Sequence, residues 1–283
     1  MSYQSIEEIR KRCEAEGIEF WKAVQLEDCN ERGASTEDSW NEMTRMWRVM
    51  CENVDAYEPD LVSRSGLVGK EGGRMEEYQK KGDTLCGDFI AKVMTVALKM
   101  GCNNACMKRI IAAPTAGACG VLPAVLIPYF KENEVPEETM VEAMYVAAGV
   151  GQVIANRAFL AGAAGGCQAE IGSACAMGAA LYAWILGLNN SLIEYAAEMG
   201  LEHNLGLTCD PVGGYVQIPC IERNGYAALR AIDCAIYAKN LGYVRKNKVS
   251  FDAVVNVMKN TGHDLNKAYK ETSLGGLALE FDL

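Results

Sequence analysis

The sequence predicts a mainly α protein, a single large helical domain in which Gly/Pro-rich loops surround a buried helix of small residues. Apolar residues recur at helical spacing along most of the chain, and no extended run shows the alternation typical of strands. The stretch AFLAGAAGGCQAEIGSACAMGAAL is rich in Gly, Ala and Ser, and each interior Gly costs an isolated helix about 1 kcal/mol relative to Ala. This helix therefore belongs at the centre of the domain, or its glycines make room for a group that is not a side chain.

Two regions are expected along the chain. Residues 1–62 form two amphipathic helices packed on the main domain, and residues 63–283 form that larger helical domain. Ser5 and Glu8 make a capping box at the first helix. Ser35 starts the second, which carries an apolar stripe. The stripe consists of Trp40, Met43, Trp47 and Met50. The Gly- and Ser-rich stretch SRSGLVGKEGGR, residues 63–74, is predicted to be a loop.

Helical periodicity continues through the larger region. Pro136 suits the first turn of one helix, and Ser191 with Glu194 has the pattern of a cap for another. The predicted helices cover 84–100, 102–112, 137–159, 167–187, 191–203, 223–241 and 250–261.

Charge and composition exclude several classes of protein. The 27 Lys and Arg against 37 Asp and Glu give a net charge of −10, so no nucleic-acid partner is expected. Residues 110–130 and 171–188 carry no charge, but the first contains three prolines and neither has the asymmetry of flanking Lys and Arg that orients a membrane segment, so no membrane role is expected. The N-terminus lacks the pattern of a secretory signal, which predicts a cytoplasmic protein with reduced cysteines.

Three of the twelve cysteines stand apart from the helical patterns. Cys167 follows two glycines, Cys209 precedes Asp-Pro, and Cys220 follows a proline. The pair Gly213–Gly214 supplies a turn that returns Cys220 towards Cys209, so the segment is predicted to present two thiolates. From spacing alone, metal ligation and ordinary loop cysteines remain equal alternatives.

Other polar residues have two interpretations each. His203 ends a predicted helix, where it acts in capping or in catalysis. Thr115 and Gly117 lie in APTAGACGVLP, a carboxylate cradle or a simple turn. Lys270 and Ser273 precede a Gly-Gly turn in YKETSLGGLAL, where a lysine is usually solvated. No phosphate-binding loop, dinucleotide fingerprint or serine-hydrolase elbow is present.

The strings APTAGACGVLPAVL, GCQAEIGSAC, EHNLGLTCDPVGGYVQIPCIERN and KETSLGGLAL, in this order, resemble the α subunit of the iron-sulfur-dependent L-serine dehydratases, or L-serine ammonia-lyases. The resemblance implies that Cys167, Cys209 and Cys220 hold a [4Fe-4S] cluster whose open iron acts as a Lewis acid. Residues 63–283 would then be the cluster-binding catalytic domain. The implied reaction deaminates L-serine to pyruvate and ammonia without pyridoxal phosphate, in amino-acid degradation and gluconeogenesis, by an oxygen-sensitive enzyme.

Two departures from this family are visible. No cysteine follows Cys234, so a cysteine-bearing tail that covers the open iron is not expected. The Ser-Ser-His-Thr type motif that carries the family's proposed catalytic histidine is absent from these residues. A β subunit is therefore expected to supply it, within an oligomer.

The remaining predictions concern the catalytic and substrate-contact residues on this chain and the alternative functions. His203 and Lys270 are the catalytic candidates on this chain, and Thr115, Gly117 and Ser273 are the candidate substrate contacts. L-Threonine and L-cysteine remain alternative substrates, because one methyl group or one sulfur in a pocket is not readable from sequence. A subunit that senses redox state through its thiols or cluster, without turnover, remains the alternative of a different class.

Overall fold

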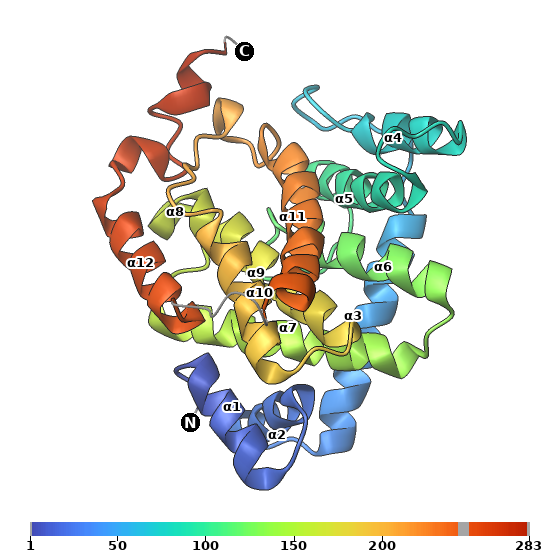
Figure 1. Ribbon diagram of the computed structural model, residues 1–283. Helices are drawn as coiled ribbons and strands as arrows, with labels where there is room; N and C mark the ends of the chain where they lie inside the picture. Colours follow the sequence, from blue (N-terminus) through green and yellow to red (C-terminus); the bar gives the residue numbers. More distant parts are fainter. Residues whose placement is uncertain (1, 243–248, 282–283) are drawn as a thin grey trace.

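The computed structural model describes residues 2–242 and 249–281, and within these ranges the protein is built from α-helices without a named strand (Figure 1). The mainly α fold class is confirmed. The α-helices are α1 (Ile6–Glu16), α2 (Phe20–Arg32), α3 (Thr36–Asp55), α4 (Glu71–Lys80), α5 (Asp88–Ala105), α6 (Val121–Asn133), α7 (Glu137–Arg157), α8 (Gly162–Gly165), α9 (Ser173–Ile185), α10 (Asn190–Glu202), α11 (Cys220–Leu241) and α12 (Phe251–Asp264). A π-helical turn spans Gln168–Gly172, and short 3-10 turns span Val212–Gly214, Lys267–Tyr269 and Gly276–Leu279.

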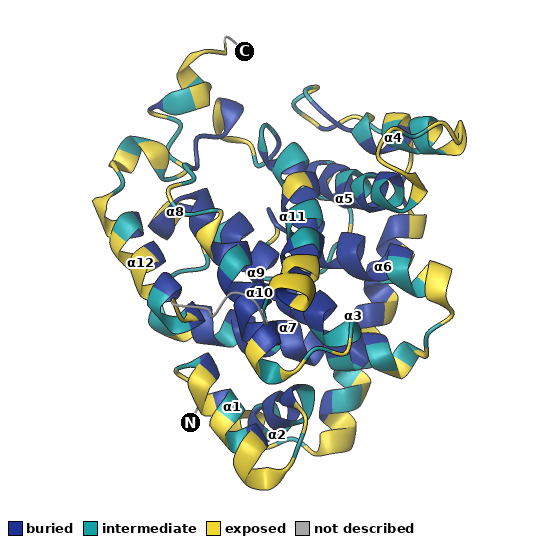
Figure 2. Ribbon diagram, viewed as in Figure 1, coloured by how far each residue is buried: buried dark blue, intermediate teal, exposed yellow. Residues whose placement is uncertain are grey.

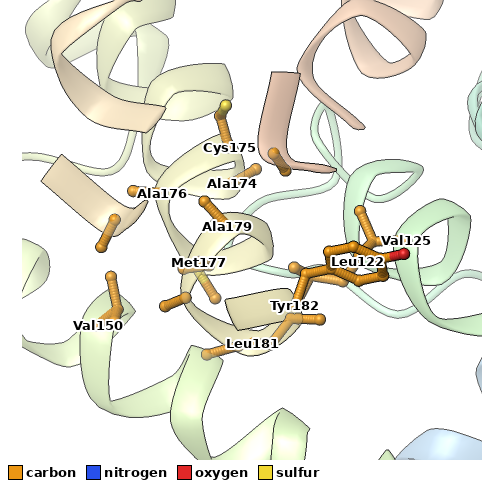
Figure 3. Close-up of a cluster of buried hydrophobic side chains, with 14 of the residues drawn as sticks. Leu122, Val125, Val150, Ala174, Cys175, Ala176, Met177, Ala179, Leu181 and Tyr182 are labelled. Carbon is orange, nitrogen blue, oxygen red and sulfur yellow. The ribbon is translucent and has the colours of Figure 1, made fainter. Parts of the chain in front are cut away.

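Helix α9 is the buried helix of small residues that the sequence predicts. Its residues Ser173–Ala183 are all buried, and it packs against α7, α10 and α11 (Figure 2). Figure 3 shows its alanine side chains among Val150 of α7 and Leu122 and Val125 of α6. Because these side chains are small, neighbouring backbones come close enough to exclude water and gain dispersion contacts.

The N-terminal region contains three helices where the sequence predicts two. Gly17 ends α1 in the left-handed conformation, at a φ of 65°, and α2 begins at Phe20. The predicted start signals are confirmed, because Ser5 Oγ accepts from the Glu8 N–H at 3.1 Å and the Ser35 side chain caps α3. Apolar side chains of these helices belong to the same core as α9, while the division after residue 62 stays a prediction.

Proline and glycine caused the main errors in the helix prediction. In place of the two helices expected at 84–100 and 102–112 there is one helix, α5, because Gly101 stays helical where it packs against Ile221. This helix ends at Ala105, so the prediction of a helix over residues 106–112 was wrong. Helix α6 was not predicted, because it contains Pro123 and Pro128, which usually interrupt a helix. Pro123 lies in the first turn, where its missing N–H costs no intrahelical bond.

Two further boundaries differ from the prediction. The loop expected over residues 63–74 ends earlier, because α4 begins at Glu71. Asn189, and not Ser191, caps α10 by accepting from the N–H groups of Ser191 and Leu192. Among the described residues, no helix is both long and apolar enough to cross a membrane.

Gly200→Ala should destabilise the fold, because a Cβ at Gly200 would lie 3.1 Å from Ala176 Cα, between the backbones of α10 and α9. Overpacking costs about 1–3 kcal/mol, more than the gain in helix propensity. After subtraction of the helix-propensity gain of about 1 kcal/mol, we expect the free energy of unfolding, measured by urea denaturation, to fall by up to about 2 kcal/mol.

Gly225→Ala is the matched control, since a Cβ at Gly225 within α11 meets no atom within 4 Å. This variant should gain about 0.5–1 kcal/mol. Equal changes in both variants would show that close approach of α9 and α10 is not a constraint on the fold.

Candidate active site

Cys167 is positioned at the point where a short turn enters the central helix. It directly follows Gly166, which has a φ of 78°, and directly precedes the π-helical turn Gln168–Gly172. The Gln168 N–H donates to Leu207 O at 3.1 Å, which ties this turn to the segment that leads to Cys209. π-Helical turns are frequent at functional sites.

Cys209 lies in an extended segment that pairs with residues near the C-terminus. Its N–H donates to Tyr269 O at 2.8 Å, and its carbonyl oxygen accepts from the Glu271 N–H at 2.7 Å, beside a parallel bridge with Lys270. The next residue, Asp210, accepts from the Leu277 N–H at 2.8 Å through Oδ2. The segment 266–281 is thus fastened along the Cys209 loop.

The glycine pair after Cys209 makes the turn that the sequence predicts. Gly213 and Gly214 have φ values of 62° and 74°, and the Val212 N–H donates to Ile218 O at 3.0 Å across the turn. The chain then starts α11 at Cys220. The returning segment brings Cys220 into the same electrostatic environment as the other two cysteines.

The three thiols are buried and free of disulfides. Those of Cys167 and Cys209 are joined by a hydrogen bond, and Cys220 interacts with both through charge. A hydrogen bond from the Cys209 thiol lowers the pKa of Cys167, and the same bond together with burial raises the pKa of Cys209. Burial raises the pKa of Cys220 to about 12, with a further contribution from charge on Cys167. The ionised form is therefore less costly at Cys167 than at Cys209 or Cys220.

Space beside Cys209 depends on a glycine. A Cβ added at Gly162 in α8 would lie 2.8 Å from Cys209 Sγ, so the absence of a side chain leaves the sulfur room. Within the described part of the chain, no group of three or more His, Cys, Asp or Glu side chains converges on one metal ion. A four-iron cluster poses a different requirement, because its thiolates bind different irons.

Arg223 is a site residue that sequence reasoning missed. It lies in the first turn of α11, where its Nη1 donates to Thr208 O at 2.7 Å and its Nη2 lies 3.7 Å from Asp210 Oδ1. Its positive charge and a hydrogen bond also lower the pKa of Cys167. The available signal was its place three residues after Cys220 in CIERN.

Glu170 is the second site residue that was not predicted, and its carboxylate is bound by the predicted cradle at Thr115 and Gly117. Thr115 Oγ1 donates to Glu170 Oε1, and the Gly117 N–H also donates to this carboxylate. Burial raises the pKa of Glu170, while these hydrogen bonds oppose the rise. Thr115 and Gly117 therefore hold a carboxylate of this chain, and a direct contact with substrate stays a prediction.

The other predicted site residues are divided between two places. Lys270 is beside Cys209 through its backbone, and Ser273 Oγ donates to Pro211 O at 2.9 Å. His203 instead lines a cavity of about 530 Å³, together with Arg223 and Tyr226. The charge of His203 acts on Asp233, and among the described residues no contact joins His203 to the three cysteines, so its catalytic role stays a prediction.

The chain belongs to the serine dehydratase alpha-chain family, because a sequence model described as "Serine dehydratase alpha chain" matches residues 15–278. This confirms the resemblance to the α subunit. The chain is similar to L-serine dehydratase of Streptomyces coelicolor, with 41% identity over 270 residues, 91% of this chain and 56% of the relative. It is also similar to L-serine dehydratase 2 of Escherichia coli, with 36% identity over 287 residues, 98% of this chain and 62% of the relative.

A third relative has the same coverage as the second. L-Serine dehydratase of Haemophilus influenzae is 37% identical over 285 residues, 98% of this chain and 62% of the relative. The chain thus spans about three fifths of the length of the curated relatives it matches.

Asn224 joins the two loops around the site, which gives a testable stability difference. Its amide donates to Gly117 O at 2.7 Å and Cys220 O at 2.8 Å and accepts from the Gly120 N–H at 2.8 Å. Asn224→Ala leaves these buried groups unpaired and should lower the free energy of unfolding by about 2–3 kcal/mol. Urea denaturation measures the change.

Asn240→Ala is the matched control at the exposed end of α11, where, within the described ranges, the amide bonds to Ile236 O alone. It should change the free energy of unfolding by less than about 0.5 kcal/mol. A loss at Asn224 no larger than at Asn240 would contradict the bridging role.

Proposed function

We propose that this chain is the cluster-bearing part of an enzyme that deaminates L-serine to pyruvate and ammonia. The observation that carries the proposal is the meeting of three buried thiols from separate segments, at Cys167, Cys209 and Cys220. The relatives named L-serine dehydratase suggest the substrate.

The donor set fits a [4Fe-4S] cluster held by three thiolates. The sulfurs come from two helix starts and one extended segment, none is in a disulfide, and Gly162 leaves room beside Cys209. When bound, such a cluster would supply an iron without a thiolate ligand, which acts as a Lewis acid on an oxygen of the substrate.

The residues of the chain itself have three tasks in this proposal. Arg223 favours the ionised form of Cys167 through its charge, the form that ligates metal. The pairing of Tyr269 and Glu271 with Cys209 fixes the extended segment and covers one side of it. Lys270 is carried to the site by the same pairing and is proposed as an acid, base or substrate contact.

A partner polypeptide is proposed to complete the site. The sequence holds only two histidines and no Ser-Ser-His-Thr type motif, while the curated relatives are longer than this chain. We infer that a β subunit supplies the base that removes the α proton of serine, and that the two chains form an oligomer. L-Threonine and L-cysteine are the alternative substrates, and initial rates with the three amino acids distinguish them.

A second candidate function follows from the thiol pair. The hydrogen bond between Cys209 and Cys167 and the lowered pKa of Cys167 are features of redox-sensitive thiols. A redox-sensing subunit would release no pyruvate from L-serine even with a cluster and a partner present, whereas the enzyme would release pyruvate and ammonia in equal amounts.

Cluster content tests the ligand set directly. After purification without oxygen, the protein should contain about four iron and four sulfide per chain, and Cys209→Ala should lose most of both because one of three thiolates is gone. Colorimetric iron and acid-labile sulfide assays measure this. Cys29→Ala, at a buried cysteine in α2, is the control and should retain both.

The absence of iron and sulfide from the wild-type protein, even after reconstitution, would refute the cluster. Equal loss from Cys29→Ala and Cys209→Ala would mean that any buried cysteine is needed for folding, and that Cys209 has no special role as a ligand.

Division of the site between two chains predicts a rate difference. The cluster-loaded chain alone should turn over L-serine at less than about 1% of the rate of the assembly with a motif-bearing partner, because a general base contributes roughly 10²–10⁴-fold. Coupled pyruvate assays measure both rates. Equal rates would show that this chain holds its own base.

A further inference from the structure

The placement of Glu170 carries an inference about how the substrate is recognised, which rests on the proposed function. Glu170 lies in the π-helical turn, three residues after Cys167, and its charge acts on both Cys167 and Cys220. The residue retains partial exposure, so its carboxylate is at the edge of the three-thiol site and not sealed in the core.

The carboxylate is held in place by neutral donors. The Thr115 hydroxyl donates to Oε1, and the Gly117 N–H supplies a second hydrogen bond. A Cβ at Gly117 would lie 2.7 Å from Oε1 and 2.9 Å from Oε2, so glycine is required for this close approach. These contacts fix the position of the carboxylate, and both donors are neutral groups.

The cations nearby do not pair with Glu170. Among the described residues Glu170 forms no salt bridge, whereas Arg223 is already committed to Thr208 O and to Asp210. The charges of Glu271 and Arg223 act on Glu170 in opposite directions, and the effect of Glu271 on the pKa of Glu170 is the larger of the two. A ligand that brings a positive group to this position would gain a charge-assisted hydrogen bond and relieve the cost of burying the carboxylate.

We propose that Glu170 binds the α-ammonium group of the amino-acid substrate, and that Thr115 and Gly117 are positioning residues for Glu170. An α-amino acid presents one ammonium group, and Glu170 is a carboxylate at the thiol site that hydrogen bonds hold in place and that forms no salt bridge within the described part of the chain. Glu170 thereby selects amino acids over the corresponding hydroxy acids.

Another chemical role for Glu170 makes a different kinetic prediction. A residue that transfers a proton during the reaction would affect mainly kcat, because its interaction changes in the transition state. A residue that binds the ammonium group acts in the bound substrate and the transition state alike, so its loss raises KM with little change in kcat.

Glu170→Gln in the cluster-loaded assembly with its partner tests the proposal. The amide keeps the shape and one acceptor but removes the charge. We expect KM for L-serine to rise about 10- to 100-fold, the range for a hydrogen bond to a charged group. The inhibition constant of L-glycerate, which has a hydroxyl in place of the amino group, should change less than about threefold because it makes no charged contact there.

Equal weakening of L-serine and L-glycerate, unchanged affinity for both, or a loss confined to kcat would overturn the proposal. Glu142→Gln is the control. Glu142 is a partly buried glutamate in α7, and burial raises its pKa as it does that of Glu170. This variant should leave kcat and KM for L-serine and the inhibition constant of L-glycerate unchanged. Absence of turnover in the wild-type assembly would instead refute the proposed function.

A second pair of variants keeps the test decisive if Glu170→Gln fails to load its cluster. Thr115→Val removes the hydroxyl donor and should raise KM for L-serine selectively, while Thr115→Ser restores the donor and should restore KM. Failure of Thr115→Ser to recover the affinity lost in Thr115→Val would contradict a positioning role.

Discussion

The site depends on the close packing of α9 against α10 and α11. Gly200 of α10 lies against the backbone of Ala176, and Gly178 of α9 faces Ala231 of α11, where larger residues would push the helices apart. Cys167 immediately precedes the π-helical turn that leads into α9, and Cys220 is the first residue of α11. Small residues in the core therefore fix the relative position of two thiols at the ends of two adjacent helices.

The third thiol depends on the backbone of a distant segment. Cys209 is not in a helix, and its peptide groups pair with Tyr269 and Glu271. Asp210 holds the same segment, because its Oδ2 accepts from the Leu277 N–H. Gly276 allows this close approach, since a Cβ there would lie 2.0 Å from Oδ2. The alpha chain therefore builds its thiol site from two rigid helix starts and one strand-like segment held by the C-terminal part.

Sequence predicted those features that depend on local chemistry. The mainly α class, the buried small-residue helix and the turn at Gly213–Gly214 followed from periodicity and glycine placement. Helix α6 was missed because burial outweighs the propensity cost of its prolines. Glu170 and Arg223 were missed because their roles depend on contacts with Thr115 and Asp210, which no local pattern encodes. The resemblance named the three cysteines and the glycine pair predicted the return of Cys220 towards Cys209, whereas the pairing of Cys209 with the C-terminal part became visible only in the tertiary fold.

We propose that Cys167, Cys209 and Cys220 together hold one cluster with an open iron, because their buried thiols meet in the fold. An anomalous-difference map at the iron absorption edge, from crystals grown without oxygen, tests it most directly. The account predicts four iron positions, three of them bonded to these sulfurs and the fourth without a thiolate from this chain. An active protein whose map has no iron beside these cysteines, or whose electron density joins two of their sulfurs in a disulfide, would contradict it.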